Sequence, residues 1–213
     1  MNAHKELRIW YNGGMDSMLA YGVAALAAYL VGSIPFGFLI GKMKGVDVRT
    51  VGSKNIGATN VYRTVGHKWG LLAFLCDFLK GFLPTFAATR LLEADWPVAV
   101  GLACVVGHTL TPYMKFKGGK GVATAFGMLM ALIPALVGTA FALFVVTVWI
   151  SHYISLGSCL AAAFLGVMIW IPTPLAHARL PLQIVMTLLA VFVIWKHRSN
   201  IARLRAGTEN KIY

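Results

Sequence analysis

Long apolar runs follow one another along most of this chain, at residues 18–40, 69–89, 96–112, 122–133, 135–150, 156–171 and 180–195. Such runs approach the roughly 20 residues that a helix needs to cross a bilayer. Backbone groups inside lipid must bond within their own segment, which favours helices. With 58% hydrophobic and 12% charged residues, the chain is too apolar for an ordinary soluble domain. The sequence therefore predicts an all-α integral membrane protein with about seven transmembrane helices.

The polar start of the chain predicts a boundary before the first apolar run. Residues 1–17 lack the long apolar stretch and the small-residue cleavage site of a signal peptide. We expect a loose N-terminal extension there, with Met15 and Met18 as alternative start sites. Residues 18–213 are expected to form a single polytopic membrane domain.

Proline marks two expected breaks in the membrane helices. Pro35 interrupts the first run and predicts a kink, because proline cannot donate a backbone hydrogen bond. Ser33 beside it either satisfies the carbonyls freed by Pro35 or places a hydroxyl near a site. Pro134 separates two further helices, the first of which is short for a bilayer.

The basic residues are distributed unevenly and predict the orientation of the chain. Lys and Arg total 19 against 7 Asp and Glu. With these spans, the polar segments 42–68, 113–121, 151–155 and 196–209 fall on one face, and they contain most of the positive charge. The positive-inside rule places that face in the cytoplasm, with the N-terminus outside and the C-terminus cytoplasmic. The surplus of positive charge indicates binding of anionic headgroups or anionic substrates. Nucleic-acid binding is not indicated, because the sequence has no basic stretch with interleaved aromatic residues.

A glycine and lysine cluster at residues 113–124 is the strongest indication of chemistry. It reads Tyr-Met-Lys-Phe-Lys-Gly-Gly-Lys-Gly-Val-Ala-Thr. Glycines let successive backbone N–H groups turn toward one anion, and lysines add positive charge. A helix starting near Val122 would add its free N–H groups and dipole. The cluster is not a Walker A loop, because Gly121 rather than Ser or Thr follows Lys120. The alternative is a cytoplasmic turn whose lysines only fix membrane orientation.

Two other polar segments on the same face offer further donors. Residues 42–68 are rich in Gly, Ser, Asn and Arg, which suit phosphate and sugar hydroxyls; a solvated loop is the alternative. In the tail, His197 and Asn200 are spaced to share a helical face with Leu204. A basic stop-transfer tail would not require His197 and Asn200.

Ionisable residues also occur inside the apolar runs. Asp77 and Lys80 lie three residues apart, on one face of the second span. They either pair with each other or leave Lys80 to reach a substrate phosphate. His108, a turn or so before the glycine and lysine cluster, is either a hydrogen-bonded helix residue or part of the binding site.

Metal and redox chemistry are not indicated. Cys76, Cys104 and Cys159 are far apart and lack paired histidine spacing, so neither zinc nor a disulfide framework is expected. The 7 acidic residues form no cluster for a divalent cation. No metal and no cofactor are therefore expected.

Three motifs together resemble the cytoplasmic motifs of the bacterial acyl-phosphate:glycerol-3-phosphate acyltransferases, the PlsY family. They are Gly-Ser-Lys-Asn-Ile-Gly-Ala-Thr-Asn at 52–60, Phe-Lys-Gly-Gly-Lys-Gly-Val-Ala-Thr at 116–124 and His-Arg-Ser-Asn-Ile-Ala-Arg-Leu at 197–204. The resemblance extends from about residue 29 to residue 209. It implies acyl transfer from acyl phosphate to glycerol 3-phosphate, giving 1-acyl-glycerol 3-phosphate, the first step of bacterial phospholipid synthesis.

The resemblance also implies roles for particular residues. It implies catalytic roles for Ser53, Lys120, His197 and Asn200. Binding of substrate or phosphate is expected at Arg49, Asn55, Gly57, Asn60, Arg63, His108, Lys117, Gly118, Gly119 and Ser155. Of these, His108 is included because it lies close to the glycine and lysine cluster, and not because of the resemblance. Glu209 is implied to be structural.

A direct transfer is the expected mechanism, because acyl phosphate is already activated and no Ser, His and Asp set suggests an acyl-enzyme. Lys120 and backbone N–H groups would stabilise the phosphate, and His197 or the substrate's own phosphate would accept the proton. Expected partners are acyl phosphate, glycerol 3-phosphate and membrane lipids, with the peripheral enzyme that makes acyl phosphate as a candidate. The expected location is the bacterial inner membrane, with the site on its cytoplasmic face.

Two other functions are compatible with parts of the sequence. A transporter or flippase for phosphorylated or lipidic anions also needs basic loops, but it predicts internal repeats that the sequence lacks. A thioester-dependent acyltransferase commonly has an Asp four residues after a His. Here Pro112 stands at that offset from His108.

Overall fold

A computed structural model describes residues 14–175 and 178–212, and these residues form helices and connecting loops without any strand. The helices are α2 (Gly14–Ser33), α3 (Phe36–Met43), α4 (Ala58–Thr64), α5 (His67–Leu91), α6 (Trp96–Thr109), α7 (Val122–Leu132), α8 (Pro134–Ser151), α9 (Ile154–Met168), α10 (Leu180–Lys196) and α11 (Arg198–Arg205), with one 3-10 turn at Pro112–Met114. Most of the expected N-terminal extension lies outside the described residues, and α2 begins at Gly14.

The long helices confirm the predicted all-helical membrane class. By length and apolar composition, four described segments can cross a membrane: Met18–Met43, His67–Leu91, Trp96–Met114 and Pro134–Ser151. A fifth is added if α10 and α11, bent by 53°, count as one span. The helices α7 and α9 are apolar but shorter. The total of seven spans and their orientation remain predictions.

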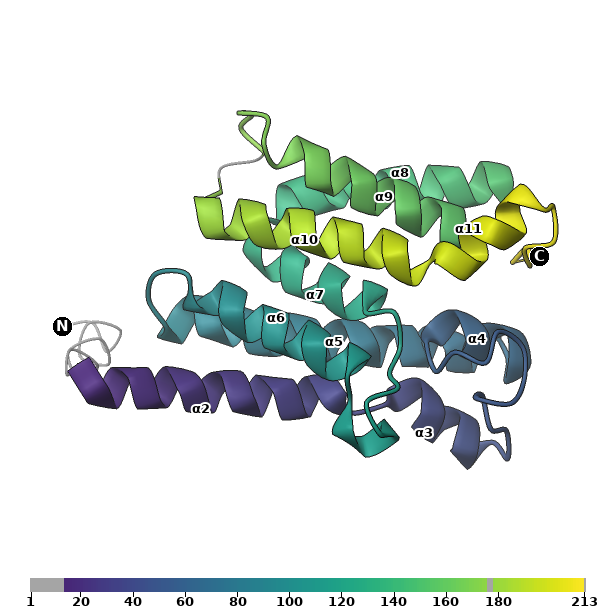
Figure 1. The fold of residues 1–213 in the computed structure, drawn as a ribbon, viewed down its shortest axis with the longest axis horizontal. Helices are drawn as coiled ribbons and strands as arrows, with labels where there is room; N and C mark the ends of the chain where they lie inside the picture. The colour runs from purple at the N-terminus through teal and green to yellow at the C-terminus, as the bar shows by residue number, and fades with distance from the viewer. Residues whose placement is uncertain (1–13, 176–177, 213) are drawn as a thin grey trace.

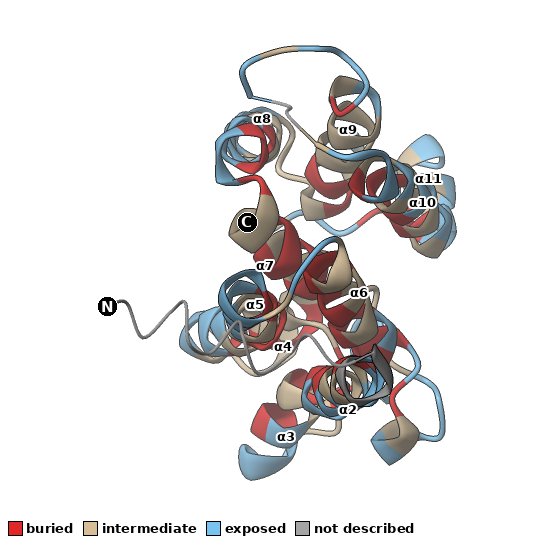
Figure 2. Cartoon of the chain, turned by 90° about the vertical axis from the view of Figure 1, so that its left-hand side faces the viewer, coloured by how far each residue is buried: buried red, intermediate tan, exposed pale blue. Residues whose placement is uncertain are grey.

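The helices form two groups with α7 between them. Figures 1 and 2 show α2, α5 and α6 on one side and α8, α9 and α10 on the other. Met128 of α7, Leu136 of α8 and Met186 of α10 are almost completely buried in one core cluster where the groups meet. Apolar side chains on the outside are exposed instead, for example Leu19 at 70% and Trp149 at 72%. An apolar exterior of this kind suits a lipid environment.

The predicted proline breaks are confirmed at Pro35 and Pro134, where α3 follows α2 and α8 follows α7. Of the two roles expected for Ser33 at the first break, bonding to a carbonyl freed by Pro35 is wrong, and a place near a site stays a prediction for this residue. Its hydroxyl donates to the carbonyl of Tyr29 at 2.7 Å, one turn back in α2. The carbonyl of Ile34 accepts a hydrogen bond from Lys80 instead, also at 2.7 Å.

The polar segments gather toward one end of the molecule. Figure 1 places α3, α4, α11 and the C-terminal end together at its right-hand side, and the loop between α6 and α7 lies toward that side. Two of these segments contain short helices. Helix α4 lies in a segment that was expected as a loop, whereas α11 agrees with the helical spacing of His197, Asn200 and Leu204 in the tail. The last described residues cross back to the break between α8 and α9, where the N–H of Ile212 donates to the carbonyl of His152 at 2.9 Å.

Candidate functional site

The glycine and lysine loop, defined as residues 115–121, is folded tightly against the end of α6. The N–H groups of Gly118 and Gly119 donate to the carbonyls of Thr109 and His108, each at 3.1 Å. A Cβ on Gly118 would lie 2.0 Å from the His108 carbonyl oxygen, so only glycine fits there. These two N–H groups therefore do not face an anion, contrary to the sequence-based expectation. The free N–H groups at the start of α7, which begins at Val122 as predicted, remain as backbone donors.

Lys120 joins the glycine and lysine loop to the C-terminal motif. Its ammonium donates to Oδ1 of Asn200 at 2.5 Å. Burial is the main reason that the pKa of Lys120 falls to about 8, with the charge of Arg203 adding to the decrease against the opposing charge of Glu209. The Lys120 side chain is therefore mostly protonated near pH 7, and its ammonium points at the amide oxygen of Asn200.

Glu209 is the centre of a buried hydrogen-bond network. Its carboxylate accepts from Asn200 Nδ2 at 2.6 Å, from Ser155 Oγ at 3.0 Å and from Arg203 Nε at 2.6 Å. Burial raises the pKa of Glu209, but these hydrogen bonds outweigh it and lower the pKa overall. The network fixes Asn200 with its oxygen toward Lys120. Arg203 was not among the predicted site residues. Its position in the basic tail, six residues before Glu209, could have indicated that it pairs with that carboxylate.

Arg63 brings the first motif to the same cluster. Its guanidinium reaches from α4 and donates through Nη2 to the carbonyl of Asn210 at 2.7 Å. Its Nε is buried without a hydrogen-bond partner among the described residues. Burial lowers the pKa of Arg63, and the nearby charge of Glu209 opposes this change. A half-buried guanidinium with an unpartnered Nε is suited to binding an anion.

His197 is held in one tautomer between α10 and α11. Its Nδ1 lies 2.8 Å from the carbonyl of Val193, which can only accept, so Nδ1 carries the proton and Nε2 has a lone pair. Burial, together with the charge of Lys120, lowers the pKa of His197 to about 4. The imidazole is therefore neutral near pH 7 and able to accept a proton.

The first motif is a loop shaped by its own asparagines. Asn60 is buried, donates to the carbonyl of Val48 at 2.8 Å and accepts from the N–H of Ser53 at 2.8 Å. Asn55 accepts from the N–H of Gly57 at 2.8 Å. Both asparagines therefore hold the backbone, while the Ser53 side chain is exposed.

Two predicted cations lie apart from the Lys120 cluster, which is defined as Arg63, Lys120, Ser155, His197, Asn200 and Glu209. Arg49 is exposed and forms an ion pair with Asp47 at 2.7 Å. Lys117 is exposed, and no contact among the described residues joins it to the cluster. The structure thus brings together Arg63, Lys120, Ser155, His197, Asn200 and Glu209, with the first-motif loop at the same end of the molecule.

A second buried cluster lies beneath the glycine and lysine loop. Lys80 Nζ is 2.6 Å from Asp77 Oδ1, which confirms the predicted pair on one face of α5. His108 Nδ1 lies 3.5 Å from the same oxygen. A Cβ on Gly119 would lie 2.1 Å from His108 Nε2, so the ring is directly under the loop. His108 supports the loop from below, and Lys80 is directed at Asp77 and the Ile34 carbonyl.

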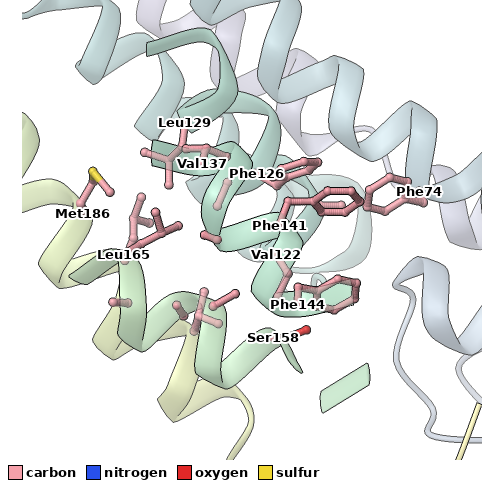
Figure 3. A pocket seen from close by; sticks show the side chains of 18 residues that line it. Phe74, Val122, Phe126, Leu129, Val137, Phe141, Phe144, Ser158, Leu165 and Met186 are labelled. Atoms are coloured by element: carbon pink, nitrogen blue, oxygen red, sulfur yellow. The ribbon is translucent and has the colours of Figure 1, made fainter. Parts of the chain in front are cut away.

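An apolar cavity of about 110 Å³ begins beside the Lys120 cluster. It is lined by α5, α7, α8, α9 and α10, and Ser158 is its polar lining residue (Figure 3). Val122 at one end follows Lys120 by two residues, and Val193 accepts the hydrogen bond from His197. Met186 and Leu129 line it farther along α10 and α7. The lining residues come from distant parts of the chain, which is why sequence alone did not identify the cavity.

The described residues contain no group of three or more His, Cys, Asp or Glu side chains suited to a metal ion. The side chains that meet at the Lys120 cluster are instead cations, amides and hydroxyls, which suit an anion.

Comparison with known proteins gives one consistent result. A family model described as glycerol-3-phosphate acyltransferase matches residues 22–207. The glycerol-3-phosphate acyltransferase of Geobacter sulfurreducens is 50% identical over 196 residues, covering 91% of this chain and 98% of its own length. That of Trichlorobacter lovleyi is 51% identical over 185 residues, with coverage of 86% and 93%.

Solved structures agree with these sequence matches. The crystal structure of PlsY, an integral membrane glycerol 3-phosphate acyltransferase, in its glycerol 3-phosphate form has a TM-score of 0.85 and 38% identity. Its lysophosphatidic acid form has a TM-score of 0.82 and 36% identity. Each comparison covers 90% of this chain and 95% of the other.

Proposed function

The chain belongs to the glycerol-3-phosphate acyltransferase family, and from this we propose that it transfers an acyl group from acyl phosphate to glycerol 3-phosphate. A hydroxyl oxygen of glycerol 3-phosphate forms a bond to the acyl carbon while the bond from that carbon to the phosphate oxygen breaks. The products are 1-acyl-glycerol 3-phosphate and inorganic phosphate, and the hydroxyl proton passes to a base. This is the acylation that begins phospholipid synthesis in bacteria.

The observation that carries this proposal is the junction between a cationic cluster and an apolar cavity. Lys120 lies two residues before Val122, which lines the cavity, and His197 is bonded to Val193, which lines it too. An acyl phosphate has an anionic head and an apolar tail, so its reactive carbonyl would lie where the two surfaces meet. A small soluble anion has no apolar group that could occupy the cavity.

Lys120 and the start of α7 are suited to the departing phosphate. In the transition state, charge grows on the phosphate oxygen and on the acyl oxygen, and preorganised donors in a dry site stabilise such charge most strongly. Lys120 supplies an ammonium already fixed by Asn200. The free N–H groups of the first turn of α7 add donors, and the helix dipole points in the favourable direction.

His197 is one of two proposed bases, and the phosphate of the bound substrate is the other. His197 has a lone pair on Nε2 and is neutral near pH 7, as a proton acceptor must be. We propose direct transfer without an acyl-enzyme. Ser155, the buried serine of the cluster, donates to the Glu209 carboxylate rather than to a histidine, so it lacks the base that would activate a nucleophile.

Arg63 is proposed to bind the phosphate of glycerol 3-phosphate, because its buried Nε has no partner among the described residues. Ser53 and Lys117, whose side chains are exposed near the same end, would close over that substrate from the two loops. Asn55, Gly57 and Asn60 would shape the first loop. Arg49 would contribute only long-range charge while it remains paired with Asp47.

The proposed setting is the bacterial inner membrane, with the C-terminus and the site in the cytoplasm. The positive-inside rule supports this orientation, because the basic segments lie at the end that carries the site. Membrane lipids would surround the apolar exterior. The peripheral enzyme that makes acyl phosphate is proposed as the source of the donor at this face.

The test is acyl transfer to radiolabelled glycerol 3-phosphate by the purified protein in detergent. Acyl phosphate is compared with acyl-CoA, each with and without a metal chelator. Product from acyl phosphate alone, unchanged by chelator, is the expected result. Product from acyl-CoA alone would replace the proposed donor, and no product from either donor would favour a transporter of lipidic anions.

A further inference from the structure

Three ionisable side chains lie buried within the helices and outside the proposed reaction. Asp77 is 2% exposed, Lys80 4% and His108 5%. Lys80 Nζ and His108 Nδ1 lie 2.6 Å and 3.5 Å from the same Asp77 oxygen. None of the three lines the apolar cavity. Ionisable groups at membrane depth are expensive and tend to be retained for function, so this cluster requires an explanation.

The first connection of this cluster is to the glycine and lysine loop. The His108 ring occupies the space where a side chain at Gly119 would lie. The His108 carbonyl also accepts the hydrogen bond from the Gly119 N–H at 3.1 Å. His108 therefore supports the loop in two ways, through its ring and through its carbonyl. The Asp77 carboxylate lies 3.5 Å from Nδ1 of that ring, which is contact distance but not a hydrogen bond. Any displacement of Asp77 is transmitted to the residues just before Lys120.

The second connection is to the first motif. Lys80 donates to the carbonyl of Ile34, in the break between α2 and α3. Helix α3, which follows this break, packs so closely on the first-motif loop that a Cβ on Gly37 would lie 2.0 Å from the carbonyl oxygen of Ile56. Lys80 therefore anchors the helix on which that loop rests.

The break is also clamped from α6. Thr111 Oγ1 donates to the carbonyl of Ser33 at 2.7 Å, and the Tyr29 hydroxyl donates to the carbonyl of Leu110 at 2.8 Å. The end of α6, the start of α3 and the middle of α5 thus form one connected unit with Asp77 at its centre.

We propose that Asp77, Lys80 and His108 are positioning residues that fix the spacing between the first-motif loop and the glycine and lysine loop. Their proposed role is to hold the two loops and not to contact a substrate. Their common oxygen, on Asp77, ties one loop through His108 and the other through Lys80. This inference rests on the proposed function, because it assumes that the two loops hold the two substrates. It predicts that loss of Asp77 weakens binding of both substrates without removing the groups that perform the reaction.

The competing explanation is an ion pair that only stabilises the fold. Removing one partner of a buried pair leaves an unpaired charge, which destabilises strongly, whereas neutralising both partners is often nearly neutral for stability. Single variants of Asp77 or Lys80 therefore cannot separate the two explanations. The double variant Asp77→Asn/Lys80→Met can, because it removes both charges and also removes the anchor of His108.

The experiment uses the full-length protein in detergent. Thermal unfolding, equilibrium binding of radiolabelled glycerol 3-phosphate, and KM and kcat with acyl phosphate are measured for wild type, Asp77→Asn, His108→Gln and the double variant. Glu93→Gln, an equivalent carboxylate-to-amide change at an exposed position between α5 and α6, is the matched control. We expect the double variant to unfold within about 2 °C of wild type and yet to bind both substrates at least about tenfold more weakly.

Each outcome decides between the explanations. A double variant with wild-type unfolding and wild-type substrate binding would overturn the proposal, as would a His108→Gln variant that is stable and binds normally. If the double variant itself fails to fold, His108→Gln alone still tests the connection to the loop. A wild-type protein that binds glycerol 3-phosphate but transfers no acyl group would reject the proposed function and leave the positioning role testable by binding.

Discussion

Lys120 and Asn200, 80 residues apart in the sequence, are joined by a hydrogen bond of 2.5 Å between the ammonium and the amide oxygen. The amide nitrogen of Asn200 donates in turn to Glu209. Asn200 thus connects the Lys120 ammonium with the buried Glu209 carboxylate. The second and third motifs of the sequence form one electrostatic unit through this single amide.

Removing the ammonium should slow the chemical step. Lys120→Ala is expected to reduce kcat by about 100-fold, roughly 3 kcal/mol, because a preorganised charge on the developing phosphate is lost. Steady-state kinetics with acyl phosphate measure this change. Lys42→Ala, at an exposed position in α3, should stay within about twofold of wild type. A fully active Lys120→Ala protein would remove the residue from the mechanism.

The low pKa of Lys120 predicts a limit at high pH. Below about pH 8 the side chain is protonated and can bind phosphate, and as pH rises through this value in the free enzyme the charge is lost. Since kcat/KM reports on the free enzyme, kcat/KM for acyl phosphate should fall above about pH 8. In Lys120→Arg the charge persists, so the decline should move to higher pH. The same decline in both proteins would assign it to another group.

Glu209 should stabilise the fold above its own pKa. The pKa is lowered in the folded state, so the stabilisation is present above the ordinary value of 4.5 and is lost as pH falls through the folded value. Glu209→Gln should lower Tm near pH 7 by about 5 °C or more, because buried hydrogen bonds to a charged group are lost. The difference in Tm should shrink on acidification. A constant difference between pH 7 and pH 4 would contradict this account.

The tight turn at Gly118 should not accept a side chain. Gly118→Ala would place Cβ against the His108 backbone carbonyl, which cannot move without displacing the end of α6. We expect acyl transfer to fall at least about tenfold, since small displacements of positioning groups have large effects on rate. Gly138→Ala, in α8 with open space around the new Cβ, serves as the control and should keep normal activity.

The apolar cavity should determine the use of long acyl chains. Ala162→Phe introduces a ring into the lining of the cavity, which should lower kcat/KM for palmitoyl phosphate about tenfold or more by displacing the tail. Butyryl phosphate, which is too short to fill the cavity, should be affected less than about threefold. Competition between the two donors measures the ratio directly, and equal losses for both chains would place the tail elsewhere.

Much of the fold could be predicted because its causes are local. Apolar runs of sufficient length favour helices in lipid, and a proline that cannot donate a backbone hydrogen bond favours a helix boundary. The breaks at Pro35 and Pro134 were therefore correctly expected. The pairing of Asp77 with Lys80 also followed from spacing on one helix. The short helix α4 was not expected, because its residues, Ala58–Thr64, are mostly polar and its position depends on packing against α5.

The site was less predictable because its contacts are not local. Nothing in the spacing of residues could show that Lys120 meets Asn200, or that His108 shares Asp77 with Lys80. Arg49 was expected near the substrate as a neighbour of the first motif, and its ion pair with Asp47, two residues away, was not foreseen. The N–H groups of Gly118 and Gly119 were expected to face an anion, but they donate hydrogen bonds to the carbonyls at the end of α6.

The brevity of α7 has a consequence for where the reaction takes place. Its 11 residues extend about 16 Å, roughly half the thickness of the hydrocarbon layer. One end of α7 must therefore lie inside that layer. We propose that this is the end that carries the glycine and lysine loop, so that a water-soluble substrate must descend below the membrane surface to reach it. Lipid thickness then becomes a variable of catalysis, because hydrophobic mismatch around α7 changes how deep that descent is.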